Sequence, residues 1–96
     1  MSVYDRIGTM QPGQTIFVDY DDTLWFHEKE EPNTPLIEAL KTAQSNGVMV
    51  FLWTHANRRE AARRSSHMRD CGLEFDGIFY DVPKGDLIID DHAVSL

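Results

Sequence analysis

Four short apolar runs are the feature that most limits how this chain can fold. They cover residues 15–18, 48–53, 77–80 and 87–89. The runs are continuous rather than alternating and rich in Ile, Val and Phe, which is typical of parallel strands covered on both faces. The first three runs are separated by segments long enough for a helix. The pattern therefore predicts an α/β fold with a small open parallel sheet and flanking helices.

Helix signals occupy both of the long connections. Asn33 or Thr34 can cap a helix that has Pro35 at its first position and ends near residues 46–47. In the second connection Asn57 stands three residues before a glutamate, as in a capping box, and Gly72 closes the segment. In residues 1–14, Pro12-Gly13 marks a turn, and the stretch before it could be a short strand, a helical turn or a loose arm.

Length and composition narrow the class of protein. A chain of 96 residues has room for one domain, residues 1–96, and no more. The formal net charge of −7 opposes indiscriminate binding to nucleic acid or to an anionic membrane. One cysteine, Cys71, excludes an internal disulfide and favours a reducing compartment. With no signal peptide pattern and no run near the roughly 20 apolar residues of a membrane span, we expect a soluble, cytoplasmic protein without a membrane partner.

Polar side chains follow the apolar runs, where an open α/β sheet binds its ligands. They are Asp19, Asp21, Thr23, Thr54, His55, Lys84, Asp90 and Asp91. Clustered carboxylates repel one another, and a divalent cation that prefers oxygen ligands, usually Mg²⁺ beside phosphates, relieves the repulsion. An ammonium and a hydroxyl group beside such a cluster are suited to bind the oxygens of a transferring phosphoryl group. The residue types therefore favour phosphoryl chemistry.

Taken in chain order, these residues form four motifs. They are Asp19-x-Asp21-x-Thr23, Thr54, Lys84 and the run Ile88-Ile89-Asp90-Asp91. The set resembles the four motifs of the haloacid dehalogenase-like (HAD) superfamily, and the resemblance spans residues 15–93. It implies a Rossmann-like core with the strand order 4-1-2-3, counted along the chain, and a Mg²⁺-dependent phosphomonoester hydrolase. The fourth strand is then an edge strand, which dimerisation could protect.

The resemblance implies catalytic roles for four residues. Asp19 is the expected nucleophile, which forms an aspartyl-phosphate intermediate. Asp21 is the expected general acid and base. Thr54 and Lys84 are expected to hold the phosphoryl oxygens, and Thr23 to stabilise the loop by hydrogen bonding.

The resemblance also implies a set of Mg²⁺ ligands. These are the Asp19 carboxylate, the Asp21 backbone carbonyl group and Asp90, with Asp91 nearby or acting through water. Members of the superfamily often carry a cap domain over the site, but residues 24–34 and 55–83 are too few to hold one. We therefore expect an open site and an accessible phosphate as substrate.

Several residues near the site have two interpretations. His55 and Arg58, close behind Thr54, are further candidates for substrate contact. Arg58 belongs to a basic helix that suits a solvated surface or a contact with nucleic acid, and Trp25 could either stack on a base or pack against the sheet. His27, like His55, is more typical of a surface or hydrogen-bonded histidine than of a catalytic one.

Other functions fit the same residues. A non-catalytic phosphate-binding or metal-binding module could keep the fold, and a phosphatase could act on the ends of nucleic acids. A phospho-accepting receiver domain also combines acidic residues, threonine and lysine, but it places them in a different chain order. Here Thr54 and Lys84 precede Asp90, which disfavours that interpretation.

Overall fold

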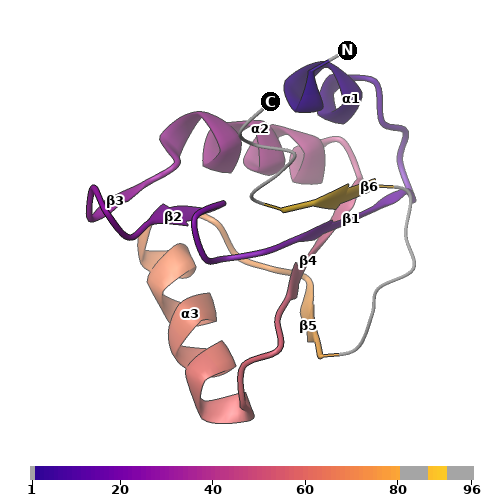
Figure 1. Ribbon diagram of the computed structural model, residues 1–96. Coiled ribbons are helices and arrows are strands. Elements are labelled where there is room, and N and C mark those ends of the chain that lie inside the picture. Colours follow the sequence, from indigo (N-terminus) through magenta and orange to yellow (C-terminus); the bar gives the residue numbers. More distant parts are fainter. Residues whose placement is uncertain (1, 81–86, 91–96) are drawn as a thin grey trace.

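The computed structural model describes residues 2–80 and 87–90 (Figure 1). Its helices are α1 (Val3–Gly8), α2 (Thr34–Ser45) and α3 (Arg58–Asp70). Its strands are β1 (Thr15–Val18), β2 (Trp25–Phe26), β3 (Glu31–Pro32), β4 (Met49–Trp53), β5 (Gly77–Phe79) and β6 (Leu87–Ile89). No helix in the described part is long and apolar enough to cross a membrane.

Four of the strands form one parallel sheet in the order β5-β4-β1-β6. Counted along the chain, this is the order 4-1-2-3, so the predicted fold class is confirmed. Val18 at the end of β1 pairs with Leu52 of β4 on one side and with Ile89 of β6 on the other. Because the strands are parallel and in register, the residues that follow them emerge at the same edge of the sheet.

The helices begin where the sequence predicts. The Asn33 side chain accepts a hydrogen bond from the backbone N–H of Leu36, and the Asn57 side chain accepts one from Glu60, at 3.4 and 2.9 Å. Of the alternatives left open for the N-terminal stretch, the structure has a helical element, α1. It begins with a reciprocal pair of hydrogen bonds, in which Ser2 caps the Asp5 backbone and the Asp5 carboxylate accepts from the Ser2 N–H.

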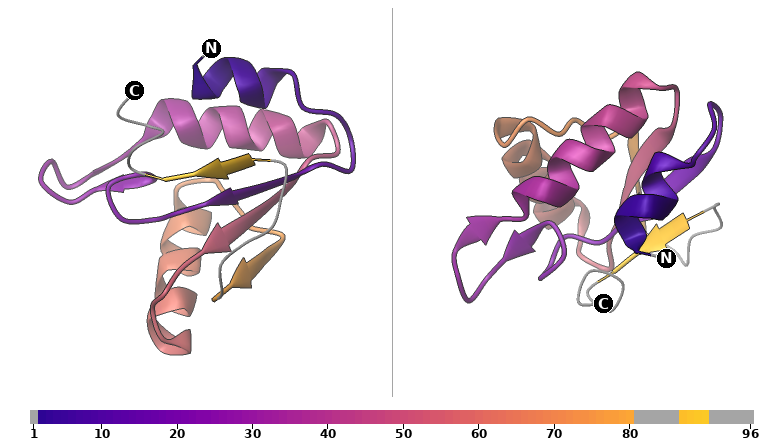
Figure 2. Two further views of the ribbon diagram at one scale, coloured as in Figure 1. Left: turned by 45° about the vertical axis from the view of Figure 1, so that its right-hand side comes forward. Right: turned by 90° about the horizontal axis from the view of Figure 1, so that it is seen from above.

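The two faces of the sheet differ. Side chains alternate along each strand, so the residues that face the helices are Ile16, Val18, Val50, Leu52, Leu87 and Ile89. All are buried in one core with Leu36 and Leu40 of α2 and Met68 of α3. Figure 2 shows α1 and α2 lying together over the sheet, with α3 apart from them beside β4 and β5.

The opposite face carries a cluster of aromatic rings. Phe17, Phe51 and Phe79 contact one another with ring centroids 5.0–5.5 Å apart. On the same face Met49, Phe79 and Ile88 are each 42–43% exposed. The expectation that the strands are covered on both faces is therefore wrong for these positions, and continuous apolar runs here conceal an alternation of buried and exposed side chains.

The two long connections that the structure describes in full, β1–β4 and β4–β5, contain no inserted domain. Between β1 and β4 the chain forms the antiparallel β2–β3 hairpin and α2, and between β4 and β5 it forms α3 (Figure 1). In the described chain, the β2–β3 hairpin is therefore the only regular structure between β1 and α2. This agrees with the expected open site.

Two neighbouring residues of β6 test which face is buried. Ile89→Ala is expected to lower the free energy of unfolding by about 2–5 kcal/mol, because it opens a cavity in the core. Ile88→Ala, the matched control, is expected to cost clearly less, roughly 1 kcal/mol, because the side chain is 42% exposed. Urea unfolding followed by tryptophan fluorescence measures both. Equal losses would contradict the assignment of faces.

Candidate functional site

The candidate site lies at the carboxyl edge of the parallel sheet. Asp19 follows β1, Thr54 follows β4 and Asp90 follows β6. The Asp19 N–H donates to the carbonyl oxygen of Ile89 at 2.9 Å, which continues the β1–β6 pairing to the residue before Asp90. Asp19 and Asp90 therefore leave neighbouring strands side by side. Lys84 and Asp91 lie outside the described residues.

A tight loop follows Asp19 and turns the chain toward the hairpin. Asp22 adopts a left-handed backbone conformation with φ 52°, which aspartate tolerates better than most residues. The buried Thr23 hydroxyl group donates to the Asp21 carbonyl oxygen at 3.4 Å, the stabilising contact expected of it. Asn33 closes the loop from α2 by donating to the Thr23 carbonyl oxygen at 2.9 Å. Asn33, the N-cap residue of α2, therefore also holds the acidic loop, residues 19–23.

The Asp21 carboxylate has a partner on each oxygen. Its Oδ1 lies 2.7 Å from His27 Nε2, and its Oδ2 lies 3.2 Å from Arg64 Nη2. His27 belongs to the β2–β3 hairpin and Arg64 to α3. The side chain expected to act as acid and base therefore joins two separate elements of the fold.

Thr54 is nearly inaccessible, with 2% of its surface exposed. Its hydroxyl oxygen accepts hydrogen bonds from the backbone N–H of Ala56 at 3.0 Å and from Arg64 Nη1 at 3.1 Å. Arg64 therefore contacts both Thr54 and Asp21, which are 33 positions apart in the sequence. The structure brings together three residues, of which the sequence analysis named only two.

Sequence reasoning could have found Arg64 from its place in the helix. It is three residues after Ala61 and four before Met68, and both of these are fully buried. Residues at this spacing share one face of a helix. A charged side chain on a buried stripe has to meet an opposite charge, so the pattern pointed to a carboxylate beside Arg64.

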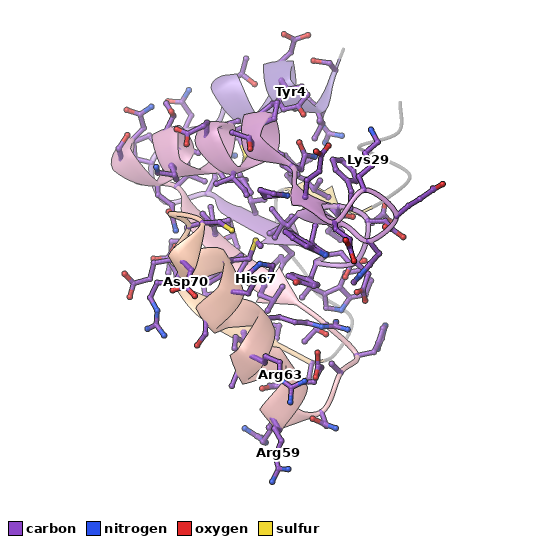
Figure 3. The ribbon with its side chains drawn as sticks, turned by 90° about the vertical axis from the view of Figure 1, so that its left-hand side faces the viewer. Tyr4, Lys29, Arg59, Arg63, His67 and Asp70 are labelled. Carbon is purple, nitrogen blue, oxygen red and sulfur yellow. The ribbon has the colours of Figure 1, made fainter. Side chains whose placement is uncertain are left out.

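The remaining substrate candidates point elsewhere. The exposed His55 ring packs against Trp53 with centroids 5.3 Å apart, and the Arg58 guanidinium lies over the Tyr80 ring at 5.2 Å. In the described part of the chain neither side chain is hydrogen-bonded to Asp21 or Thr54. Arg59 and Arg63 lie on the exposed surface of α3, which Figure 3 shows in side view.

Tyr20, in the loop after Asp19, belongs to a cluster of rings with Trp25 and His67. Tyr20 is 7% exposed, and its hydroxyl group lies 2.6 Å from Nδ1 of His67. Trp25 packs edge-on against the same His67 ring, with centroids 4.6 Å apart, and against the core. Burial raises the pKa of Tyr20 above its usual value of 10.0, and the nearby Arg64 charge opposes this rise. Tyr20 and Trp25 are therefore both engaged in contacts with His67.

The donor atoms at this edge suit a hard cation. Asp19 and Asp90 offer carboxylate oxygens from adjacent strands, and the loop adds the Asp21 carbonyl oxygen, all of which are the oxygen ligands that Mg²⁺ takes. Within residues 2–80 and 87–90, no group of three His, Cys, Asp or Glu side chains could by itself hold a metal ion. The expected set contains two described side chains and a backbone oxygen, with Asp91 outside the described residues.

Comparison with known proteins supports the fold and names no activity. No protein-family model and no curated protein matches the sequence. Among solved structures, a conserved protein from Bacteroides thetaiotaomicron superimposes with a TM-score of 0.72 and is 27% identical in sequence. The match covers 85% of this chain and 78% of that one.

The contact between Tyr20 and His67 can be tested by removing one oxygen atom. Tyr20→Phe is expected to lower the free energy of unfolding by about 0.5–1.5 kcal/mol at pH 7. Because the folded-state pKa is raised, the hydroxyl contribution is present below pH 10 and is lost as the pH rises further. Urea unfolding at pH 7 and above pH 10 measures this. The control Tyr4→Phe, at an exposed position, should leave stability unchanged, and an equal effect of both variants would contradict the prediction.

Proposed function

We propose that this protein is a Mg²⁺-dependent phosphomonoester hydrolase of the HAD type that acts through an aspartyl-phosphate intermediate. The observation that carries the proposal is the meeting of Asp19, Asp21, Thr54 and Asp90 at one edge of a sheet with the strand order 4-1-2-3. Motif order in the sequence and position in the sheet are separate requirements, and these residues satisfy both. Lys84 and Asp91 complete the proposed set.

The proposed reaction has two displacements at phosphorus. In the first, a carboxylate oxygen of Asp19 forms a bond to phosphorus while the ester bond to the leaving oxygen breaks, and Asp21 donates a proton to that oxygen. In the second, Asp21 takes a proton from water as the water oxygen attacks the same phosphorus. The bond to Asp19 then breaks, which releases phosphate and restores the carboxylate.

The contacts of Asp21 limit how it can carry its proton. Its two carboxylate oxygens face nitrogen atoms, one on His27 and the other on Arg64. A protonated carboxyl group donates from one oxygen, so the contact at that oxygen has to adjust when Asp21 directs its proton to the leaving group. The exposed His27 side chain is the partner that has room to move.

Asp19, the Asp21 carbonyl group and Asp90 would hold the metal, with Asp91. Bound Mg²⁺ offsets the negative charge that the nucleophile and the phosphoryl oxygens bring together. The Tyr20 N–H donates to Asp19 Oδ1 at 2.8 Å and fixes one oxygen of the nucleophile.

The open edge of the sheet favours a substrate with an accessible phosphate group. The connections that could hold a cap domain contain only the hairpin, α2 and α3. A small phosphate ester would be poorly enclosed, whereas a phosphate on a larger molecule could reach the site without a lid.

Replacing the nucleophile tests the proposal directly. Asp19→Asn is expected to reduce hydrolysis of p-nitrophenyl phosphate to background, because an amide cannot form the acyl phosphate. Asp22→Asn is the matched control, since it makes the same change three residues further on and asparagine also tolerates a left-handed backbone. It should retain turnover.

Each result separates the proposal from its main alternative. Turnover that survives Asp19→Asn would contradict a covalent mechanism at this residue. A wild-type chain that binds phosphate but hydrolyses no phosphate ester would instead indicate a binding module with the same fold.

Asp90 provides a test of the metal. Asp90→Asn is expected to raise the Mg²⁺ concentration needed for half-maximal turnover by about tenfold or more, because a carboxylate ligand is lost. A titration of activity with Mg²⁺, after treatment with EDTA, measures this. Unchanged metal dependence would remove Asp90 from the proposed ligand set.

A further inference from the structure

Arg64 is the cation that α3 directs toward the candidate site. Its side chain is 18% exposed, and its guanidinium group lies over the Tyr20 ring at 5.2 Å. A cation stacked on a buried aromatic ring and partly removed from water has a fixed position and a weakly screened charge. Among the described residues, no other lysine or arginine contacts Asp21 or Thr54.

The hydrogen bonds of Arg64 leave part of its donor capacity unused. A guanidinium group carries five N–H donors. One on Nη1 bonds to Thr54, one on Nη2 pairs with Asp21, and Nε lies 3.6 Å from Glu60 Oε1 without forming a hydrogen bond. Each terminal nitrogen therefore keeps one N–H, next to the two residues that would flank a phosphoryl group.

The Thr54 hydroxyl group, which is bonded to Arg64, also has a donor to offer to an anion. It accepts from Ala56 and from Arg64, which engages both of its lone pairs. Its proton therefore points away from these two donors and is available to a hydrogen-bond acceptor. Because Thr54 itself is buried, an anion that reaches this proton also meets the guanidinium group bonded to the same oxygen.

We propose that Arg64 binds the phosphoryl oxygens together with Thr54. The assignment rests on the proposed function as a phosphate-processing site, but it requires binding only and no turnover. The ligand class is a phosphate monoester or inorganic phosphate. In this arrangement Arg64 exchanges part of its contact with Asp21 for the phosphoryl oxygens, and planar, paired N–H donors are well matched to two such oxygens.

A simpler role for Arg64 is to neutralise Asp21 and Glu60 as a structural ion pair. The two roles differ in what they predict for anion affinity. A structural ion pair stabilises the fold without favouring phosphate, whereas a phosphate-binding residue raises the affinity for phosphate in proportion to its charge and hydrogen bonds.

Calorimetric titration with inorganic phosphate, in buffer containing Mg²⁺, distinguishes these roles. Arg64→Ala and Arg64→Gln are expected to weaken phosphate binding by about tenfold or more, the loss of one charge-assisted hydrogen-bonding group. Arg63→Ala is the matched control, because Arg63 is the neighbouring arginine, is 70% exposed and pairs with the same Glu60. It should bind phosphate within about twofold of wild type.

Adding millimolar guanidinium to Arg64→Ala provides a second measurement. Recovery of phosphate affinity in this variant, and not in Arg63→Ala, is expected if the guanidinium group acts on the ligand. If Arg64→Ala fails to fold, as circular dichroism would show, Arg64→Gln, which keeps more of the aliphatic stem and removes the charge, decides the question.

The outcomes separate this assignment from the proposed hydrolase. Wild-type phosphate affinity in a folded Arg64 variant overturns the assignment even if Asp19-dependent hydrolysis is found. No phosphate binding by the wild-type chain overturns it as well. Arg64-dependent binding in a chain that hydrolyses no phosphate ester supports the assignment and contradicts the hydrolase.

Discussion

The parallel pairing of β1 with β4 and β6 is the interaction on which the candidate site depends. β1 lies inside the sheet, with backbone hydrogen bonds to a neighbour on each side, and its Ile16 and Val18 are completely buried. A shift of one residue in this register would turn these side chains to the opposite face. Burial of the core therefore fixes the register of the strands, and the register determines where Asp19, Thr54 and Asp90 lie relative to one another.

Charge compensation shapes the edge that this pairing creates. The chain carries a net charge of −7, and several of its carboxylates are gathered at this edge. The Asp21 carboxylate contacts groups from two elements, His27 of the hairpin and the charged Arg64 of α3. The hairpin histidine is exposed and the helix arginine is mostly buried, so one partner is free to move while the other is held by packing.

Much of the fold could be predicted because each of its signals is local. The apolar runs and the two asparagine caps follow from residues close together in the sequence, and the handedness of crossovers then favours an open parallel sheet. The strand order is implied by the resemblance to the HAD superfamily. The exposed positions on the aromatic face of the sheet could not be predicted in this way. Runs such as Met49–Trp53 are apolar at every position, so period-2 alternation is absent from the sequence, and only the position of the helices shows which side chains are buried.

The sequence by itself determined the candidate residues Asp19, Asp21, Thr54 and Asp90, because their order along the chain and their places after apolar runs are properties of the sequence alone. Tertiary structure decided which side chains join them. Arg64 approaches Thr54 and Asp21 because α3 packs its Ala61 and Met68 face against the core. Arg58, nearer to Thr54 in the sequence, turns to Tyr80 instead. Distance along the chain is a poor guide here, because the orientation of a packed helix determines where its side chains point.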